Sequence, residues 1–403
     1  MSTPEKSLLL SSQGKNAGTH QLTVNPNQTQ RYIVVYPQNA SLPHLKQAPH
    51  LITRKLNDTI NISFVDLTSP QAQDLKNALV KVNGSIHINT ERKIKDPLTD
   101  EFDPTDVTIK QINASKYPSA APTCPKITMG EQFIVFFPDS LVNLKNFPGC
   151  NLSIGNNYSG SDKPCNPHSS YTYSVFKQVL GDVKLQAVNI PVFNCGGHGT
   201  TENITQALLD ILDYAKSNPT KKVAMFFAVS GGIPNPAETA TVQELLKAGV
   251  MVGVSAGNNG ANICNKNIPP WNVPGVLQIG ATMAPGDRCP YFTNWSDVVP
   301  TSPFGDCVNA YLPGQFTIKQ FNKPEKGTSF AVPQAVAWTL RWWNDNPNAT
   351  AADVVQAFKN HTVTITKSGP AYYPPLVKDG LIPVLETATF CSTNVTSNKP
   401  RPS

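Results

Sequence analysis

Short apolar stretches alternate with amphipathic stretches from Gln132 onward, and this alternation restricts the possible folds more than any other feature of the chain. The apolar stretches have the length of buried strands, whereas apolar residues in the amphipathic stretches recur with helical spacing. This alternation predicts an α/β domain whose mostly parallel sheet is covered by helices. The expected strands are Phe133–Phe137, Val183–Val188, Val223–Ala228, Val250–Val254 and Val276–Ile279, and the expected helices are Ile204–Lys216, Thr239–Ala248, Pro333–Trp343 and Ala351–Phe358. An active site is expected at the carboxyl ends of these strands.

The first quarter of the chain has a different composition, because all eight cysteines lie beyond residue 120. It predicts a small α+β unit with a helix capped by Ser69, with Pro70 as its first residue and Ala72, Leu75, Leu79 and Val82 on one face. Its expected strands are Arg31–Tyr36, Ile60–Val65 and Ser85–Asn89. We therefore expect a tail over 1–30, this unit over 31–95, an exposed linker over 96–123, a large domain over 124–392 and a tail over 393–403.

Composition excludes several classes of protein. The net charge of +6 is spread over 403 residues without a basic block, so nucleic acid is not an expected partner. No apolar run is long enough to cross a bilayer, and the N-terminus lacks the apolar stretch of a signal peptide. Thirteen Asn-x-Ser/Thr acceptors and eight cysteines without C-x-x-C spacing nevertheless indicate glycosylation and disulfides, and hence secretion.

The segment from Gly327 to Pro333 places Ser329 at the mouth of a predicted helix. A serine there has an exposed hydroxyl for attack on a carbonyl and a free backbone N–H to stabilise the resulting oxyanion. An ordinary helix cap would have the same sequence.

Several segments together resemble the subtilisin-like serine peptidases, the subtilases. Gly327–Ala337 is similar to their nucleophile segment, and Val254–Gly260 to their oxyanion-asparagine loop, with Asn258 as the oxyanion donor. Val276–Thr282 resembles their next strand and Ala310–Gly314 a later turn. The resemblance extends from Gln132 to Ala388 and implies a subtilisin-like three-layer domain and a serine endopeptidase.

In that family the catalytic residues follow the order Asp, His, Ser, so the base must precede Ser329. The Gly-His-Gly-Thr sequence around His198 is similar to the family's histidine motif, but too little chain separates it from the later strands. The alignment instead favours His168 as the base and Asp139 as the acid that orients it. An aspartate at the end of a strand is also common in ordinary turns.

The resemblance also implies how substrate binds, since an extended peptide would pair with Gly197, His198 and Gly199 on one side and with Val229, Ser230 and Gly231 on the other. The first quarter resembles the family's inhibitor-type propeptide, a ferredoxin-like α+β domain that inhibits and helps to fold its own enzyme. Cleavage is expected between Ile94 and Pro118. We expect a monomer that cuts proteins or peptides without a required cofactor. Structural calcium is consistent with the family, although no acidic cluster marks a site.

Two alternatives remain open from the sequence. No glycine follows Asp139-Ser140, His168 is followed by Ser-Ser-Tyr, and Gln334 replaces a histidine common in the family, which would also suit an inactive, glycosylated binding protein. The Gly-x-Ser-x-Gly pattern around Ser255 fits an α/β-hydrolase, but a loop sequence rather than a helix follows it.

Overall fold

The computed structural model describes residues 28–94, 132–181, 185–229, 235–258, 273–283, 291–292, 307–318, 320–363 and 376–377. Both predicted tails, except residues 28–30, and the predicted linker therefore lie outside the described residues. None of the helices in the described part of the chain is both long enough and apolar enough to cross a membrane.

The large domain contains a sheet whose strands lie in the order β16-β17-β14-β12-β11-β10-β6-β8-β7. Adjacent strands from β14 to β7 all pair in parallel, and β13, β15 and β16 add antiparallel pairs at one end. The mostly parallel α/β arrangement predicted from the sequence is thus present. The strands are β6 (Phe133–Ser140), β7 (Leu152–Ile154), β8 (Gln186–Phe193), β10 (Lys222–Phe227), β11 (Met251–Ser255), β12 (Leu277–Met283), β13 (Tyr291–Phe292), β14 (Ala310–Ile318), β15 (Lys323–Lys326), β16 (Thr362–Val363) and β17 (Leu376–Val377).

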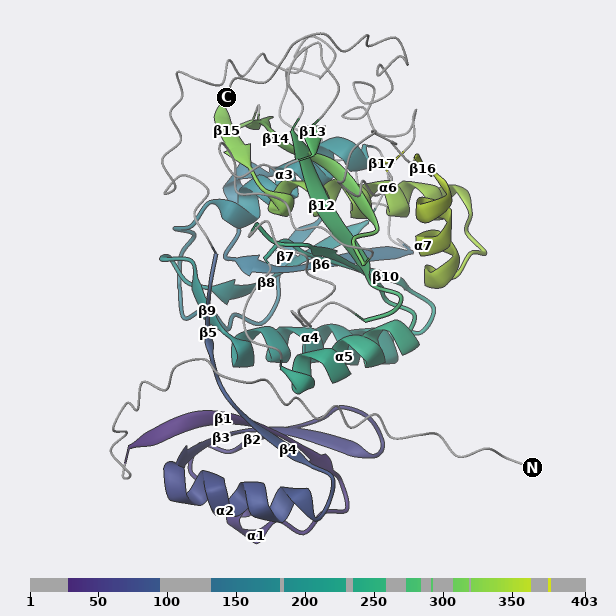
Figure 1. Cartoon of the computed structure of the whole chain (residues 1–403). Helices are drawn as coiled ribbons and strands as arrows, with labels where there is room; N and C mark the ends of the chain where they lie inside the picture. Colours follow the sequence, from purple (N-terminus) through teal and green to yellow (C-terminus); the bar gives the residue numbers. More distant parts are fainter. Residues whose placement is uncertain are drawn as a thin grey trace, which may run out of the picture.

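Helices cover both faces of this sheet, giving three layers (Figure 1). Successive residues of β6 alternate between the layers, as strand geometry requires. Phe133, Val135 and Phe137 belong to the core that contains residues of α3 and α6, whereas Ile134 and Phe136 belong to the core that contains those of α4 and α5. The helices are α3 (His168–Leu180), α4 (Thr201–Ser217), α5 (Pro236–Lys247), α6 (Thr328–Asp345) and α7 (Ala351–Asn360).

The N-terminal unit is an antiparallel sheet in the order β2-β3-β1-β4, with α2 packed on one face. This order, with helices after β1 and β3, is the ferredoxin-like arrangement predicted from the sequence. Its elements are β1 (Thr29–Pro37), α1 (Pro43–Lys46), β2 (Ile52–Lys55), β3 (Ile60–Thr68), α2 (Ser69–Val80), β4 (Ser85–Ile88) and β5 (Glu91–Lys93), the last of which leaves the sheet and pairs with β9 (His198–Thr200) of the large domain.

Some local expectations were wrong. Thr68, not Ser69, caps α2, and its capping box with Gln71 explains why the helix begins one residue earlier than predicted. Ala310–Gly314, expected as a turn, forms the first half of β14, because β12 pairs in parallel along it despite Pro313. Helix α6 begins at Thr328, five residues before its predicted start at Pro333, so Ser329 lies inside its first turn.

The sheet of the N-terminal unit lies on helices α4 and α5 (Figure 1). Residues of β1 alternate between two cores, with Tyr32 and Val34 facing α2 and Ile33 sharing a core with Leu208 of α4. The two units are thus joined by a continuous apolar layer, in which burial removes apolar surface from water.

This layer predicts that Phe64→Ala destabilises the chain, because Phe64 is 0% exposed and shares its core with α4 and α5. The expected loss is about 3–5 kcal/mol in the free energy of unfolding, measured by urea denaturation on a Ser329→Ala background. Val80, 70% exposed on α2, supplies the control, and Val80→Ala should change stability by less than about 0.5 kcal/mol. Equal effects of the two substitutions would contradict this packing.

Candidate active site

Asp139 and His168 meet at the carboxyl end of β6. The Nδ1 atom of His168 lies 2.8 Å and 2.9 Å from the two carboxylate oxygens of Asp139. Asp139 is completely buried near the end of its strand, and His168, 6% exposed, opens α3. Asn166 fixes the entry to this helix, because its side-chain oxygen accepts a hydrogen bond from the His168 backbone N–H at 3.0 Å.

Two further donors stabilise the Asp139 carboxylate. The Ser140 N–H donates to Oδ1 at 2.6 Å, and the Thr172 hydroxyl donates to Oδ2 at 3.3 Å. A buried carboxylate requires such partners to offset its lost hydration. A carboxylate beside Nδ1 places the imidazole proton on Nδ1, so Nε2 is the nitrogen with base character.

Ser329 lies in the first turn of α6 and is half-buried. Its hydroxyl donates to the Ala228 carbonyl at 2.6 Å, directly after β10. The neighbouring Phe330 ring has its centroid 6.0 Å from that of His168, so the start of α6 packs close to the Asp139–His168 pair.

Asn258 follows β11 and lies against the same helix start. Its side-chain oxygen accepts from the Thr328 backbone N–H at 3.0 Å and from the Thr328 hydroxyl at 3.1 Å. With the oxygen engaged, the amide nitrogen is the group that can donate to a bound substrate. Gly327 has a φ of +132°, and a Cβ there would lie 3.3 Å from that nitrogen, so this position favours glycine.

His198 takes no part in this arrangement. Its Nδ1 lies 2.6 Å from a carboxylate oxygen of Glu91 on β5. The backbone of Gly197, His198 and Gly199 instead pairs with β5: Arg92 is opposite Gly199, Lys93 is opposite His198, and the Ile94 N–H donates to the Gly197 carbonyl at 2.7 Å. Val229 is buried after β10, whereas Ser230 and Gly231 lie outside the described residues.

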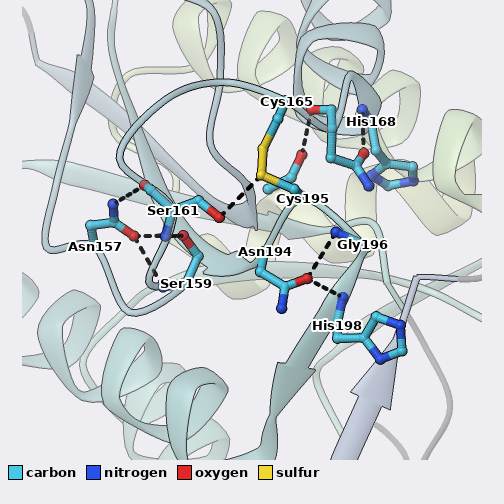
Figure 2. Close-up of a disulfide and its surroundings, with 11 residues drawn as sticks. Asn157, Ser159, Ser161, Cys165, His168, Asn194, Cys195, Gly196 and His198 are labelled. Atoms are coloured by element: carbon cyan, nitrogen blue, oxygen red, sulfur yellow. Dashed lines mark hydrogen bonds between the residues drawn. A yellow bond between two sulfur atoms is a disulfide. The ribbon is translucent and has the colours of Figure 1, made fainter.

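A disulfide connects the two histidine-bearing regions. Cys165, three residues before His168, is bonded to Cys195 in the turn before His198 (Figure 2). Within that turn the Asn194 side-chain oxygen accepts from the N–H groups of Gly196 and His198, both at 3.0 Å. The edge predicted to pair with substrate is therefore covalently tied to the loop that leads into α3.

The sequence analysis missed one charged pair near this edge. Arg92 of β5 forms an ion pair of 2.9 Å with Glu238 in the first turn of α5, with side-chain exposures of 2% and 0%. Burial raises the pKa of Glu238 to about 7, although Arg92 opposes this shift. The sequence separation of 146 between the partners explains why no local pattern indicated the pair.

The described residues give little support to Ser255 as an alternative nucleophile or to a metal site. Ser255 is 1% exposed at the end of β11, and residues 256–258 after it are not helical, unlike a hydrolase elbow. Within the described ranges, no cluster of three or more His, Cys, Asp or Glu side chains could hold a metal ion.

Comparison with known proteins adds sequence relatives, although no protein-family model matches the chain. It is 28% identical over 236 residues to the "Extracellular serine proteinase" of Thermus sp. (strain Rt41A), covering 54% of this chain and 51% of the relative. It is 26% identical over 171 residues to "Subtilisin-like protease 3" of Trichophyton tonsurans, covering 42% and 41%. This chain therefore spans about half the length, or less, of these curated relatives.

A solved structure described as a cold adapted subtilisin-like serine proteinase matches with a TM-score of 0.49 and 20% identity, covering 63% of this chain and 91% of that one. The sequence matches and the mostly parallel α/β sheet agree with the resemblance carried by the segments around Ser329 and Asn258. The chain is therefore a homologue of the subtilisin-like serine proteinases, the subtilases.

Proposed function

We propose that the chain is a secreted serine endopeptidase in zymogen form, with Asp139, His168 and Ser329 as its catalytic triad. The observation that carries this proposal is the buried Asp139–His168 contact beside the helix start that bears Ser329. A carboxylate that fixes the tautomer of an imidazole near a serine hydroxyl is the arrangement that serine acyl transfer requires.

In the proposed reaction the Ser329 hydroxyl attacks the peptide carbonyl while Nε2 of His168 takes its proton. The Asn258 amide and the Ser329 backbone N–H donate hydrogen bonds to the oxyanion that forms. His168 then protonates the leaving amine as the C–N bond breaks and an acyl-enzyme remains. Water activated by His168 hydrolyses this ester and restores the Ser329 hydroxyl.

The pairing of β5 with β9 supports inhibition by the N-terminal unit. An extended peptide that adds a strand to this edge would use the backbone of Gly197 to Gly199, and β5 already occupies it. Partly buried arginine contacts to α4 hold the unit in place: Arg31 forms a bidentate pair with Glu202 at 2.7 Å, and Arg54 contacts Asp210 at 3.0 Å. We infer that substrate gains access only after this unit is cleaved and released.

The second candidate is a binding protein without catalysis. The orientation of the Ser329 hydroxyl favours this candidate, because it donates to the Ala228 carbonyl. The hydroxyl would have to break this hydrogen bond and rotate before it could attack a substrate. Labelling of the active serine separates the two candidates.

A fluorophosphonate probe should label the processed wild-type protein, because the triad makes Ser329 nucleophilic. Ser329→Ala should abolish labelling, and His168→Ala should lower the labelling rate and kcat by at least about 10⁴-fold. The matched control is Ser255→Ala, which should label like the wild type. Unlabelled wild type, measured by mass spectrometry of the probe adduct, would favour the binding protein.

Asn258→Ala and Asn258→Asp each remove the proposed amide donor. Both should lower kcat by about 10²–10³-fold with KM nearly unchanged, a magnitude that itself comes from an oxyanion donor in this family. The measurement is steady-state hydrolysis of a peptide substrate, with circular dichroism to verify folding. An effect confined to KM would remove Asn258 from the oxyanion site.

Self-processing gives a further prediction. N-terminal sequencing of purified wild-type protein should find a new terminus between Ile94 and Pro118, whereas Ser329→Ala should keep the original one. Adding catalytic amounts of processed wild type to Ser329→Ala tests cleavage between molecules. The same terminus in Ser329→Ala purified alone would attribute the cut to another protease.

A further inference from the structure

We propose that Glu238 is a specificity-determining residue, which selects substrates with an arginine at the position that Arg92 occupies on β5. This inference rests on the proposed endopeptidase function and names a substrate class for it: extended peptide segments that carry a guanidinium upstream of the cleaved bond.

The position of β5 supplies the first step. Arg92 and Lys93 lie in antiparallel register with Gly199 and His198, the edge proposed to take substrate. A Cβ on Gly197 would lie 3.3 Å from the Ile94 Cβ and 3.4 Å from Asn166 Nδ2. Because the Asn166 side-chain oxygen accepts from the His168 backbone N–H, β5 ends beside the proposed catalytic base. Arg92 is therefore on the amino-terminal side of the bond that would be cut.

Alternation along β5 supplies the second step. Arg92 and Ile94 are buried, whereas Glu91 and Lys93 are exposed, as expected when every second side chain enters the protein. Gly199, opposite Arg92, admits no side chain, since a Cβ there would lie 2.5 Å from the Val192 carbonyl oxygen. The buried Arg92 guanidinium lies 2.9 Å from the Glu238 carboxylate, so a side chain at this position is buried against an acidic partner.

Charge supplies the third step. Among the described residues, Oε1 of Glu238 has no hydrogen-bond partner, and Arg92 is the cation that faces the carboxylate. Burial raises the pKa of Glu238, which expresses the cost of keeping its charge away from water. An apolar side chain at the Arg92 position would cover this carboxylate without pairing it, and desolvated charges left unpaired strongly weaken binding. Arg92 reaches the carboxylate through one charge-assisted hydrogen bond, from Nη2 to Oε2 at 2.9 Å. Lysine would supply a more strongly hydrated point charge, which costs more to bury than a guanidinium.

The first experiment measures cleavage by the processed wild-type enzyme. Internally quenched peptides copy residues 89–98, with Arg, Lys or Leu at the Arg92 position, and a control peptide carries Leu at the exposed Lys93 position. We expect kcat/KM for Arg to exceed that for Leu on the order of 10²-fold, with Lys between them. Leu at the Lys93 position should change kcat/KM by less than about threefold.

The isosteric variant Glu238→Gln should reduce the Arg-over-Leu ratio to about threefold or less, because the charge is removed while the shape is kept. Cleavage of all peptides at equal rates, or a ratio that survives in Glu238→Gln, would overturn the assignment while leaving the endopeptidase function intact.

The second experiment does not depend on catalysis and uses the full Ser329→Ala chain. Hydrogen exchange of the β5 and β9 amides, followed by mass spectrometry, should rise at least about tenfold in Arg92→Leu, because an unpaired Glu238 opposes docking of β5. The double variant Arg92→Leu/Glu238→Leu should regain protection, and Lys93→Leu should exchange like its parent. Unchanged exchange in Arg92→Leu would overturn the proposal even if the chain proved to have no peptidase activity.

Discussion

Parallel pairing of β6, β10 and β11 is the constraint on which the candidate site depends. Parallel strands end at the same edge of a sheet, so the residues at or just beyond their carboxyl ends become neighbours irrespective of sequence distance. Asp139 lies at the end of β6, Ala228 follows β10 and Asn258 follows β11. Helices α3 and α6 begin at this edge, which brings His168 and Ser329 to the same place.

Pairing of β5 with the edge of β9 accounts for how the N-terminal unit contacts the large domain. An unpaired strand edge attracts other chains, and β9 would present one without its pairing to β5. The unit docks through apolar residues of its sheet and through arginines that meet carboxylates of α4: Arg31 with Glu202, and Arg54 with Asp210. These pairs are partly buried, with side-chain exposures between 11% and 22%, and their complementary charges fix the orientation of docking.

Local sequence patterns predicted the elements whose signals are strong and missed those that depend on distant partners. The apolar run of β6 and the helical spacing of apolar residues in α4 were sufficient to predict these two elements, although both are longer than predicted. Strand β2, with one half-buried residue among exposed ones, has no such pattern and exists because it pairs with β3.

The candidate site was predicted through family resemblance rather than through pattern. The histidine motif around His198 looked more typical than that of His168, yet only the spacing of later elements favoured His168. The structure brings His168 to Asp139 and leaves His198 with Glu91. Roles in catalysis for these residues remain predictions.

The pairing of Arg92 with Glu238 is difficult to explain as a simple anchor. A buried ion pair costs the hydration of both groups, and replacing such a pair with apolar residues is often neutral or stabilising. A chain that needed only to fasten β5 would gain more from an apolar contact, as Ile94 already makes directly after the strand. A carboxylate becomes useful when the edge must accept one kind of segment and reject others, because rejection arises from the charge left unpaired. On the proposed function, Glu238 would hold the chain's own strand before cleavage and discriminate among substrates afterwards.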